Sequence, residues 1–293
     1  MGRWRSCCAR IRNSATTHHS QRRSQSDIDG NHPLGALLRD ASGDLFDTTW
    51  VGGKKKAACK PSGCGVVFKI SAAGVYSVLY AFTNHGDGMG PRAGLIQDAA
   101  GTLYGTTSGA GATHGSVFAI NAAGQETTLY SFTTGNSGGG RYGPLVEDAS
   151  GNLYGTTFGD GPTGQGNVFE ITAAGAYVSL YDFAGGADGA QPASGLLLVG
   201  GDLIGTTVAG GNPGGGTVFD VNISTKQKTV LYNFNGGSGY NDGVDPIFGP
   251  LVLDSVGNIY GTCEYGGTSN YGTIYELIPI RLKTDVRPFA RAD

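Results

Sequence analysis

The pentapeptide Leu103-Tyr104-Gly105-Thr106-Thr107 recurs along the chain, and this recurrence decides the fold. Further copies, some of them altered, stand at Leu45-Phe46-Asp47-Thr48-Thr49, Leu153-Tyr154-Gly155-Thr156-Thr157, Leu203-Ile204-Gly205-Thr206-Thr207 and Ile259-Tyr260-Gly261-Thr262. In chain order, the first residues of successive copies are 58, 50, 50 and 56 positions apart. Such a period is typical of a protein built from one repeated supersecondary unit.

Two further strings follow each copy, so the whole unit repeats. One is an apolar pair, at Val67-Phe68, Val117-Phe118, Val168-Phe169, Val218-Phe219 and Ile274-Tyr275. The other closes the unit, at Leu79-Tyr80-Ala81-Phe82, Leu129-Tyr130-Ser131-Phe132, Leu180-Tyr181-Asp182-Phe183, Leu231-Tyr232-Asn233-Phe234 and the degenerate Val286-Arg287-Pro288-Phe289. β-Branched and aromatic residues favour strands, and helical start signals are absent. We therefore predict four short strands in each unit.

A repeated four-stranded meander of about 50 residues is typical of a β-propeller. We predict an all-β, propeller-like fold of five four-stranded units over residues 29–293. A closed ring is favoured, which would depend on packing between the first and last units. An open array, a fragment of a larger ring and a β-sandwich are the alternatives. The units cover about residues 33–90, 91–143, 144–191, 192–249 and 250–293.

Composition limits the function classes. Glycine supplies 53 of the 293 residues, and charged residues make up only 15%. The net charge is −3, so the charge of the whole chain does not indicate nucleic-acid binding. Residues 1–28 carry six arginines without periodicity, and we expect a disordered basic leader there. No apolar run is long enough for a transmembrane helix or resembles the core of a signal peptide.

The repeated strings resemble a known family. Segments such as Gly151-Asn152-Leu153-Tyr154-Gly155-Thr156-Thr157, the Gly-x-Val-Phe strand start and the closing Leu-Tyr-x-Phe are similar to the GloVer tandem repeat of bacterial "choice-of-anchor" surface proteins. The resemblance covers residues 29–293. It implies export and display at the cell surface, although no export signal or sorting anchor is recognisable in this sequence. It implies no catalytic residues, because none are established for the family.

Connectivity predicts which residues share a surface. In a meander, the loops between strands two and three lie on the same rim as those between successive units, and these loops vary in length. Function tends to reside in variable loops on a rigid scaffold. We therefore expect a binding rim that includes Lys54, Lys55, Lys56, His85, Asp87, Asp160, Asp188, Asp242, Glu264 and Tyr265.

Repetition separates scaffold from function. Asp40, Asp98, Asp148 and Asp254 precede the same turn, where a carboxylate accepts backbone N–H groups. The Asp-Gly pairs at Asp29, Asp87, Asp188 and Asp242 are most simply turn formers, with calcium binding by these carboxylates as the alternative. The non-repeated aromatic residues suit a sugar-stacking surface, and they are Trp50, Tyr142, Tyr240, Tyr265 and Tyr271.

The cysteines favour a disulfide over a metal site. Cys59 and Cys64 can close a small loop in an oxidising compartment. His85 and His114 are isolated, so no metal-ligand spacing is present. The sequence contains no nucleotide- or cofactor-binding motif in the structural context that such a motif needs, and we expect no cofactor.

Three functions follow from these features. We favour an extracellular or cell-surface, non-catalytic binding module, acting as a monomer on a glycan or a surface protein. The alternatives are a purely structural element and a polysaccharide hydrolase. A hydrolase would need two opposed carboxylates, for which Asp160, Glu264 and Asp47 are the candidates.

Overall fold

The structure of the protein is a computed structural model. The predicted leader, residues 1–28, lies outside the residues that it describes. Those residues are 29–53, 59, 61–109, 115–132, 143–159, 161–235, 242–247, 249–267, 269–280 and 283–288.

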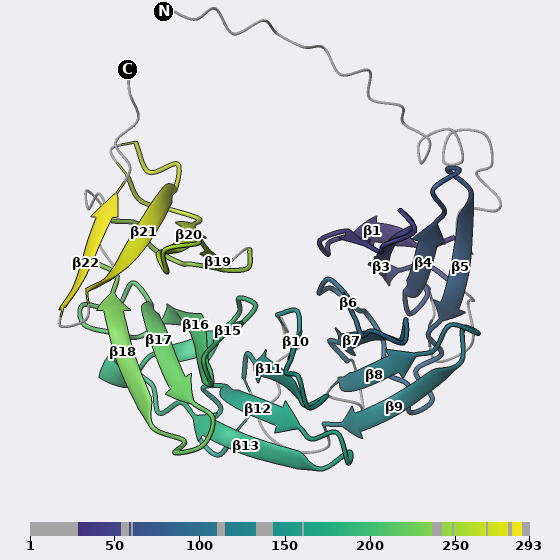
Figure 1. Ribbon diagram of the computed structural model, residues 1–293, viewed down its shortest axis with the longest axis horizontal. Coiled ribbons are helices and arrows are strands. Elements are labelled where there is room, and N and C mark those ends of the chain that lie inside the picture. Colours follow the sequence, from purple (N-terminus) through teal and green to yellow (C-terminus); the bar gives the residue numbers. More distant parts are fainter. Residues whose placement is uncertain are drawn as a thin grey trace, which may run out of the picture.

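The described chain forms five antiparallel sheets, which we call blades 1 to 5 (Figure 1). Blade 1 holds β1 (Asn31–Pro33), β2 (Leu38–Arg39), β3 (Leu45–Val51), β4 (Val66–Ile70) and β5 (Tyr76–Ala81). Blade 2 holds β6 (Ile96–Gln97), β7 (Leu103–Thr107), β8 (Ser116–Ile120) and β9 (Glu126–Ser131). Blade 3 holds β10 (Val146–Glu147), β11 (Leu153–Thr157), β12 (Asn167–Ile171) and β13 (Tyr177–Asp182).

Blades 4 and 5 continue the same order. The 3₁₀ turn η2 (Gly186–Asp188) leads into blade 4, which holds β14 (Ala190–Pro192), β15 (Leu197–Val199), β16 (Asp202–Ala209), β17 (Thr217–Asn222) and β18 (Lys228–Asn233). Blade 5 holds β19 (Val252–Leu253), β20 (Ile259–Cys263), β21 (Thr273–Ile280) and β22 (Lys283–Pro288). In each blade the recurring pentapeptide forms the second main strand and pairs with the Val-Phe strand. The all-β, propeller-like fold predicted from the repeats is confirmed.

The central glycine of the pentapeptide is a packing requirement. Gly105 pairs with Phe118 across β7 and β8, and a Cβ on Gly105 would lie 2.6 Å from Cζ of that ring. Gly155 and Gly205 stand in the same relation, at 2.6 Å, to Phe169 and Phe219. A larger residue would displace the ring that each blade buries against its neighbour.

The turn between the first two strands is built by its aspartate and glycine. Oδ1 of Asp148 accepts the N–H groups of Ser150 at 2.8 Å and Asn152 at 2.9 Å, and Oδ2 accepts the Tyr154 hydroxyl at 2.9 Å. Burial works to raise the pKa of Asp148, but the hydrogen bonds together lower it. The glycines of the five turns have φ between 82° and 96°, which only glycine adopts readily. They are Gly43, Gly101, Gly151, Gly201 and Gly257.

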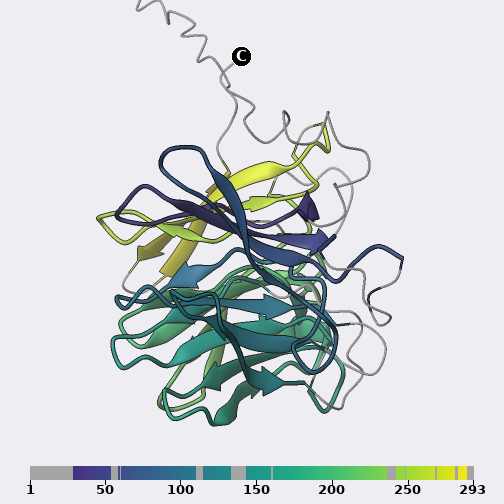
Figure 2. The same cartoon turned by 90° about the vertical axis from the view of Figure 1, so that its right-hand side faces the viewer.

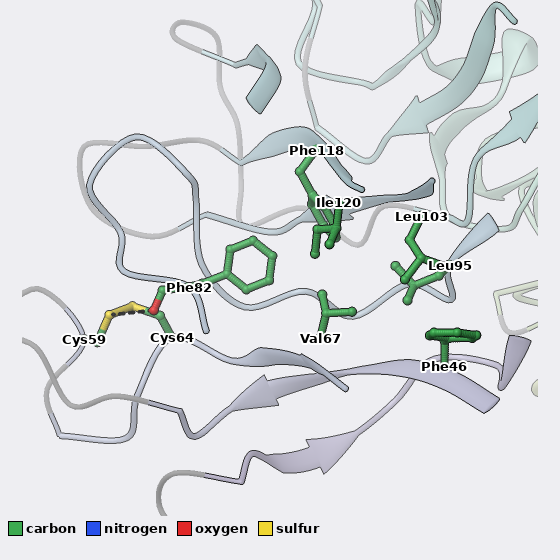
Figure 3. Close-up of a cluster of buried hydrophobic side chains, with 9 residues drawn as sticks. All are labelled: Phe46, Cys59, Cys64, Val67, Phe82, Leu95, Leu103, Phe118 and Ile120. Carbon is green, nitrogen blue, oxygen red and sulfur yellow. Dashed lines mark hydrogen bonds between the residues drawn. A yellow bond between two sulfur atoms is a disulfide. The ribbon is translucent and has the colours of Figure 1, made fainter. Parts of the chain in front are cut away.

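Each of blades 1 to 4 packs its front face, the one toward the next blade in chain order, on the back face of that next blade. Figure 3 shows the first such cluster, where Val67 and Phe82 of blade 1 meet Leu103 and Phe118 of blade 2. Three further clusters repeat the arrangement along the chain. In each, a phenylalanine ring meets an aromatic ring of the next blade edge to face, and the pairs are Phe82–Phe118, Phe132–Phe169, Phe183–Phe219 and Phe234–Tyr275.

The threonines of the pentapeptide divide between two tasks. Thr48 and Thr206 each donate a hydrogen bond to a backbone oxygen at the start of the next blade, at 3.1 Å and 2.7 Å. The second threonine instead joins strands within a blade, as between Thr107 and Ser116 at 2.9 Å. The first threonine therefore joins blades at Thr48 and Thr206, whereas the hydroxyl groups of Thr106 and Thr156 are buried without a hydrogen-bond partner among the described residues.

The five blades form an open arc rather than the closed ring that the sequence favoured. Figure 1 shows blade 1 and blade 5 at opposite ends, separated by a gap, and Figure 2 shows the arc from the side. In the described residues, the hydrophobic clusters join blades 1 and 2, 2 and 3, 3 and 4, and 4 and 5. The repeat strings could not reveal this, because a closed and an open array use the same inter-blade contacts.

Candidate functional site

The variable loops gather on one rim, as the connectivity predicts. The backbone N–H of Gly90, in the link from blade 1 to blade 2, bonds the carbonyl of Cys64 at 2.7 Å. Likewise, the backbone N–H of Gly211, in the loop between β16 and β17, donates to the carbonyl of Gly186, in the link from blade 3 to blade 4, at 2.8 Å. We call this side the loop rim. Its described residues lie within 52–65, 83–92, 158–166, 184–189, 208–216, 235–249 and 264–272.

A disulfide stabilises the loop rim at blade 1. Cys59 and Cys64 are bonded, with their Cα atoms 5.0 Å apart. Their exposed fractions are 2% and 0%, and they cap one end of the cluster between blades 1 and 2 (Figure 3). The bridge thus holds a long insertion against the core. The predicted rim residues Lys54, Lys55 and Lys56 lie in this insertion but outside the described residues.

Asp87 organises the link between blades 1 and 2. Its carboxylate is 7% exposed and accepts the Tyr80 hydroxyl at 2.8 Å and the backbone N–H groups of Thr83 and His85 at 2.7 Å and 3.0 Å. His85 itself is exposed. The turn-forming interpretation of this Asp-Gly pair is confirmed by these contacts. Binding of a ligand by Asp87 or His85 stays a prediction.

Asp188 and Asp242 repeat this design with other partners. Asp242 accepts the Tyr232 hydroxyl at 2.7 Å and the Asn235 side-chain amide at 2.8 Å. Asp188 accepts the hydroxyl of Tyr181 at 2.7 Å and pairs with the ammonium group of Lys228 at 2.8 Å. Burial works to raise the pKa of Asp188, but the hydrogen bonds from Lys228 and the backbone lower it overall.

Sequence reasoning missed Lys228. Its side chain is only 2% exposed and lies over the rings of Tyr181 and Phe183, at 5.7 Å and 5.5 Å from their centroids. The lysine belongs to the outer strand of blade 4, whereas both rings belong to blade 3. The available signal was a basic residue at a strand position taken by Tyr76, Glu126 and Tyr177 in blades 1 to 3.

At blade 5 the loop rim combines carboxylates with exposed aromatic rings. Tyr265 pairs with Val244 through the backbone, and the Glu264 N–H bonds the Asp245 carbonyl at 3.0 Å. A hydrogen bond to Glu264 raises the pKa of Tyr265. Burial, and then the charge of Glu264, raise the pKa of Asp245. Tyr265 is 45% exposed and Tyr271 92%.

Trp50 lies at the other end of the arc and is partly covered. The Arg92 guanidinium carbon is 4.2 Å from the centroid of its ring, and His32 approaches with ring centroids 6.1 Å apart. Trp50 is 36% exposed. One face of this ring is therefore occupied by Arg92, which leaves Tyr265 and Tyr271 as the more accessible of the predicted stacking residues. Tyr142 and Tyr240 lie outside the described residues.

The carboxylates proposed for a hydrolase are not brought together. Asp47 is 2% exposed in β3 of blade 1, at the position that glycine takes in the other blades. Burial raises the pKa of Asp47 to about 6, partly offset by a hydrogen bond from the Thr48 backbone. Glu264 is exposed in blade 5, at the opposite end of the arc (Figure 1). Asp160 lies outside the described residues.

Two general features complete the description. Across the described ranges, no group of three or more His, Cys, Asp or Glu side chains is arranged to hold a metal ion. Within that same part of the chain, no helix has the length and apolar character needed to cross a membrane.

Solved structures similar to this chain include β-propellers. A gluconolactonase, XC5397 from Xanthomonas campestris, is 13% identical with a TM-score of 0.52, over 90% of this chain and 78% of that one. TolB from Acinetobacter baumannii is 11% identical with a TM-score of 0.48, over 78% of this chain. The chain matches 49% of the TolB structure, about half its length. At these identities the likeness concerns the fold alone.

Sequence comparison identifies the family. No curated protein matches the chain. The Gloeobacter/Verrucomicrobia repeat matches residues 112–290, which is more than half of the sequence and covers the predicted third and fourth units and most of the fifth. This is the repeat that the Leu-Tyr-Gly-Thr-Thr and Leu-Tyr-x-Phe strings resemble, so the chain belongs to the Gloeobacter/Verrucomicrobia repeat family.

Proposed function

We propose that this protein is an extracellular or cell-surface binding module that holds a glycan or a protein on its loop rim without catalysing a reaction. Support comes from the division of labour between repeated and non-repeated residues. Repeated residues such as Asp148, Gly105 and Phe118 have contacts that build or join blades, whereas the loop-rim residues differ from blade to blade. Variable loops on a rigid scaffold are where binding residues concentrate.

One observation carries this proposal: the loop rim of blade 5 exposes the rings of Tyr265 and Tyr271 and also carries Glu264 and Asp245. Tyrosine combines a large apolar face with a polar tip and is enriched at binding surfaces. Ionised carboxylates accept hydrogen bonds from hydroxyl and amide donors. A sugar has an apolar ring face that can stack on tyrosine and hydroxyl groups that can donate to carboxylates. A tyrosine-rich protein contact also uses exposed rings and carboxylate acceptors.

The surface location is supported by two further features. The Cys59–Cys64 bridge suits an oxidising compartment. The chain also belongs to a bacterial repeat family, which the sequence resemblance associates with surface proteins.

A glycan array and a panel of bacterial surface proteins, each probed with and without calcium, test the function. We expect saturable binding that Tyr271→Ala and Tyr265→Ala weaken about tenfold each, as for anchor aromatic residues. Val256→Ala is the matched control, because Val256 is 78% exposed on the opposite rim of the same blade. Binding that both tyrosine variants leave unchanged contradicts the proposal, as does the absence of any ligand.

A catalytic role would give a different result. Turnover of a polysaccharide that is abolished by Glu264→Gln or Asp160→Asn, with binding retained, would show a hydrolase instead. Binding without turnover, lost in the tyrosine variants, supports the module.

A further inference from the structure

The open arc leaves two blade faces without a neighbouring blade. One is the front face of blade 5, with Val252, Thr262 and Ile274. The other is the back face of blade 1, with Leu34 and Leu37. Both sets can be compared with residues at the same register in the other blades, where a neighbouring blade is present.

The front face of blade 5 exposes what the other blades bury. Ile274 pairs with Thr262 as Val218 pairs with Thr206 in blade 4. Ile274 is 58% exposed, whereas its equivalents are fully buried, at 0% for Val67, Val117, Val168 and Val218. Thr262 is exposed, while its equivalents are at most 2% exposed, and these are Thr48, Thr106, Thr156 and Thr206. Val252, on the same face, is 57% exposed.

The back face of blade 1 shows the same contrast at two leucines, whereas Phe68 and Asp47 at its centre are buried, at 7% and 2% exposure. Leu37 precedes the short first strand of its blade and is 58% exposed. The leucines at the same place in the later blades are Leu95 at 5%, Leu145 at 1%, Leu196 at 4% and Leu251 at 6%. Leu34, which follows Pro33, is 57% exposed, whereas Ile247, which follows Pro246, is 7% exposed.

Apolar exposure in the described residues is confined to the two terminal blades. The exposed large hydrophobic residues are Leu34, Leu37, Trp50 and Val75 in blade 1, and Val252, Leu253, Val256, Tyr265, Tyr271 and Ile274 in blade 5. Repeat arrays usually end in capping units with a polar outer face. Here both outer faces keep the apolar residues of an internal interface.

The two faces are the two halves of one interface. Four times within the chain, a front face with the features of blade 5 packs on a back face with the features of blade 1. The chain cannot easily bring its own two ends together, because closing the gap would disturb four interfaces whose valines and phenylalanines are already buried. A second copy offers the complementary face without any such change.

We propose that the front face of blade 5 docks on the back face of blade 1 of a second copy of this chain. The two surfaces differ, so the contact is heterologous and continues head to tail instead of closing as a symmetric pair. The copy adds its first blade where a sixth blade would stand. This assembly replaces the monomer expected from the sequence, and it leaves the loop rim free for a ligand.

The mass of the protein as a function of concentration, measured by sedimentation velocity, tests the proposal. We expect a rising series of head-to-tail oligomers. Ile274→Asp removes the front face and Leu37→Asp the back face, so each variant alone should stay monomeric. Both residues are exposed in the single chain, so both variants should fold. Val256→Asp and Val75→Asp, on exposed turns of the same two blades at 78% and 63% exposure, are the matched controls and should associate as the parent does.

Mixing the two variants identifies the geometry. The Ile274→Asp chain keeps its back face and the Leu37→Asp chain keeps its front face, so an equimolar mixture should give a one-to-one dimer and nothing larger. A parent chain that stays monomeric up to about 1 mM overturns the proposal. So does association that neither variant weakens, or a mixture that stays monomeric.

Discussion

Ile274 of blade 5 and Val218 of blade 4 occupy the same register, opposite Thr262 and Thr206, yet Ile274 is 58% exposed and Val218 is fully buried. The difference lies in the neighbour, because only Val218 has a following blade against its front face. Each internal blade thus depends on the next for the burial of its apolar residues.

Truncation of these two residues should have unequal effects on stability. Val218→Ala removes buried methyl groups from the cluster between blades 4 and 5 and should lower the free energy of unfolding by about 2 kcal/mol. Ile274→Ala in the monomer should change it by less than about 0.5 kcal/mol. Urea titrations at a concentration too low for association measure both values. Equal losses would mean that another segment covers blade 5.

Much of the fold could be predicted because the residues that build it repeat. Gly105 and its copies, the turn aspartates such as Asp148, and the ring of Phe118 each have the same task in several blades. A single sequence therefore supplies several independent indications of one local structure. The clustering of variable loops on one rim follows from connectivity in the same manner.

The openness of the arc and the contacts of the loop-rim residues could not be predicted as well as the repeated parts of the fold. Ile274 and Val218 are near-identical residues, and the repeat does not record which of them has a neighbour. Residues that occur in one blade alone lack the internal comparison that repetition provides. Lys228 shows the consequence, since its partner Asp188 lies 40 residues away and no other described blade repeats that ion pair.

The buried carboxyl of Asp47 should make stability depend on pH. Its pKa is about 6 in the folded chain against 3.8 for an exposed aspartate, because burial disfavours the charge. A raised pKa means that stability is fully present below about pH 4 and is lost as the pH rises through 6. At pH 7 the charged group should cost about 3 kcal/mol.

Asp47→Asn removes this dependence. The variant should unfold at higher urea than the parent at pH 7, and the difference should vanish near pH 4. Asp220, whose pKa burial and Asp202 also raise to about 6, is present in both proteins and cancels in the comparison. A difference that is the same at both pH values would show that Asp47 titrates as an exposed group.

The Cys59–Cys64 bridge should contribute modestly to stability. In the chain-entropy model, closing so short a loop stabilises the fold by about 2 kcal/mol. The Cys59→Ser/Cys64→Ser variant should therefore unfold at lower urea, and a reducing agent should lower the midpoint of the parent but leave that of the variant unchanged. A parent insensitive to reduction, with its thiols then shown to be free, would contradict this expectation.

The ion pair between Asp188 and Lys228 should be the most sensitive polar contact between blades 3 and 4. Asp188→Asn leaves the ammonium group buried, at 2% exposure, without a countercharge, and should cost about 3–5 kcal/mol. Adding Lys228→Met should recover most of the loss, because a flexible apolar chain can pack against the rings of Tyr181 and Phe183 without needing a charge. A double-mutant cycle measured by urea unfolding gives the coupling between the two residues. Additive losses in the two single variants and the double variant would mean that Lys228 finds water or another partner, and that the aspartate serves only its own turn.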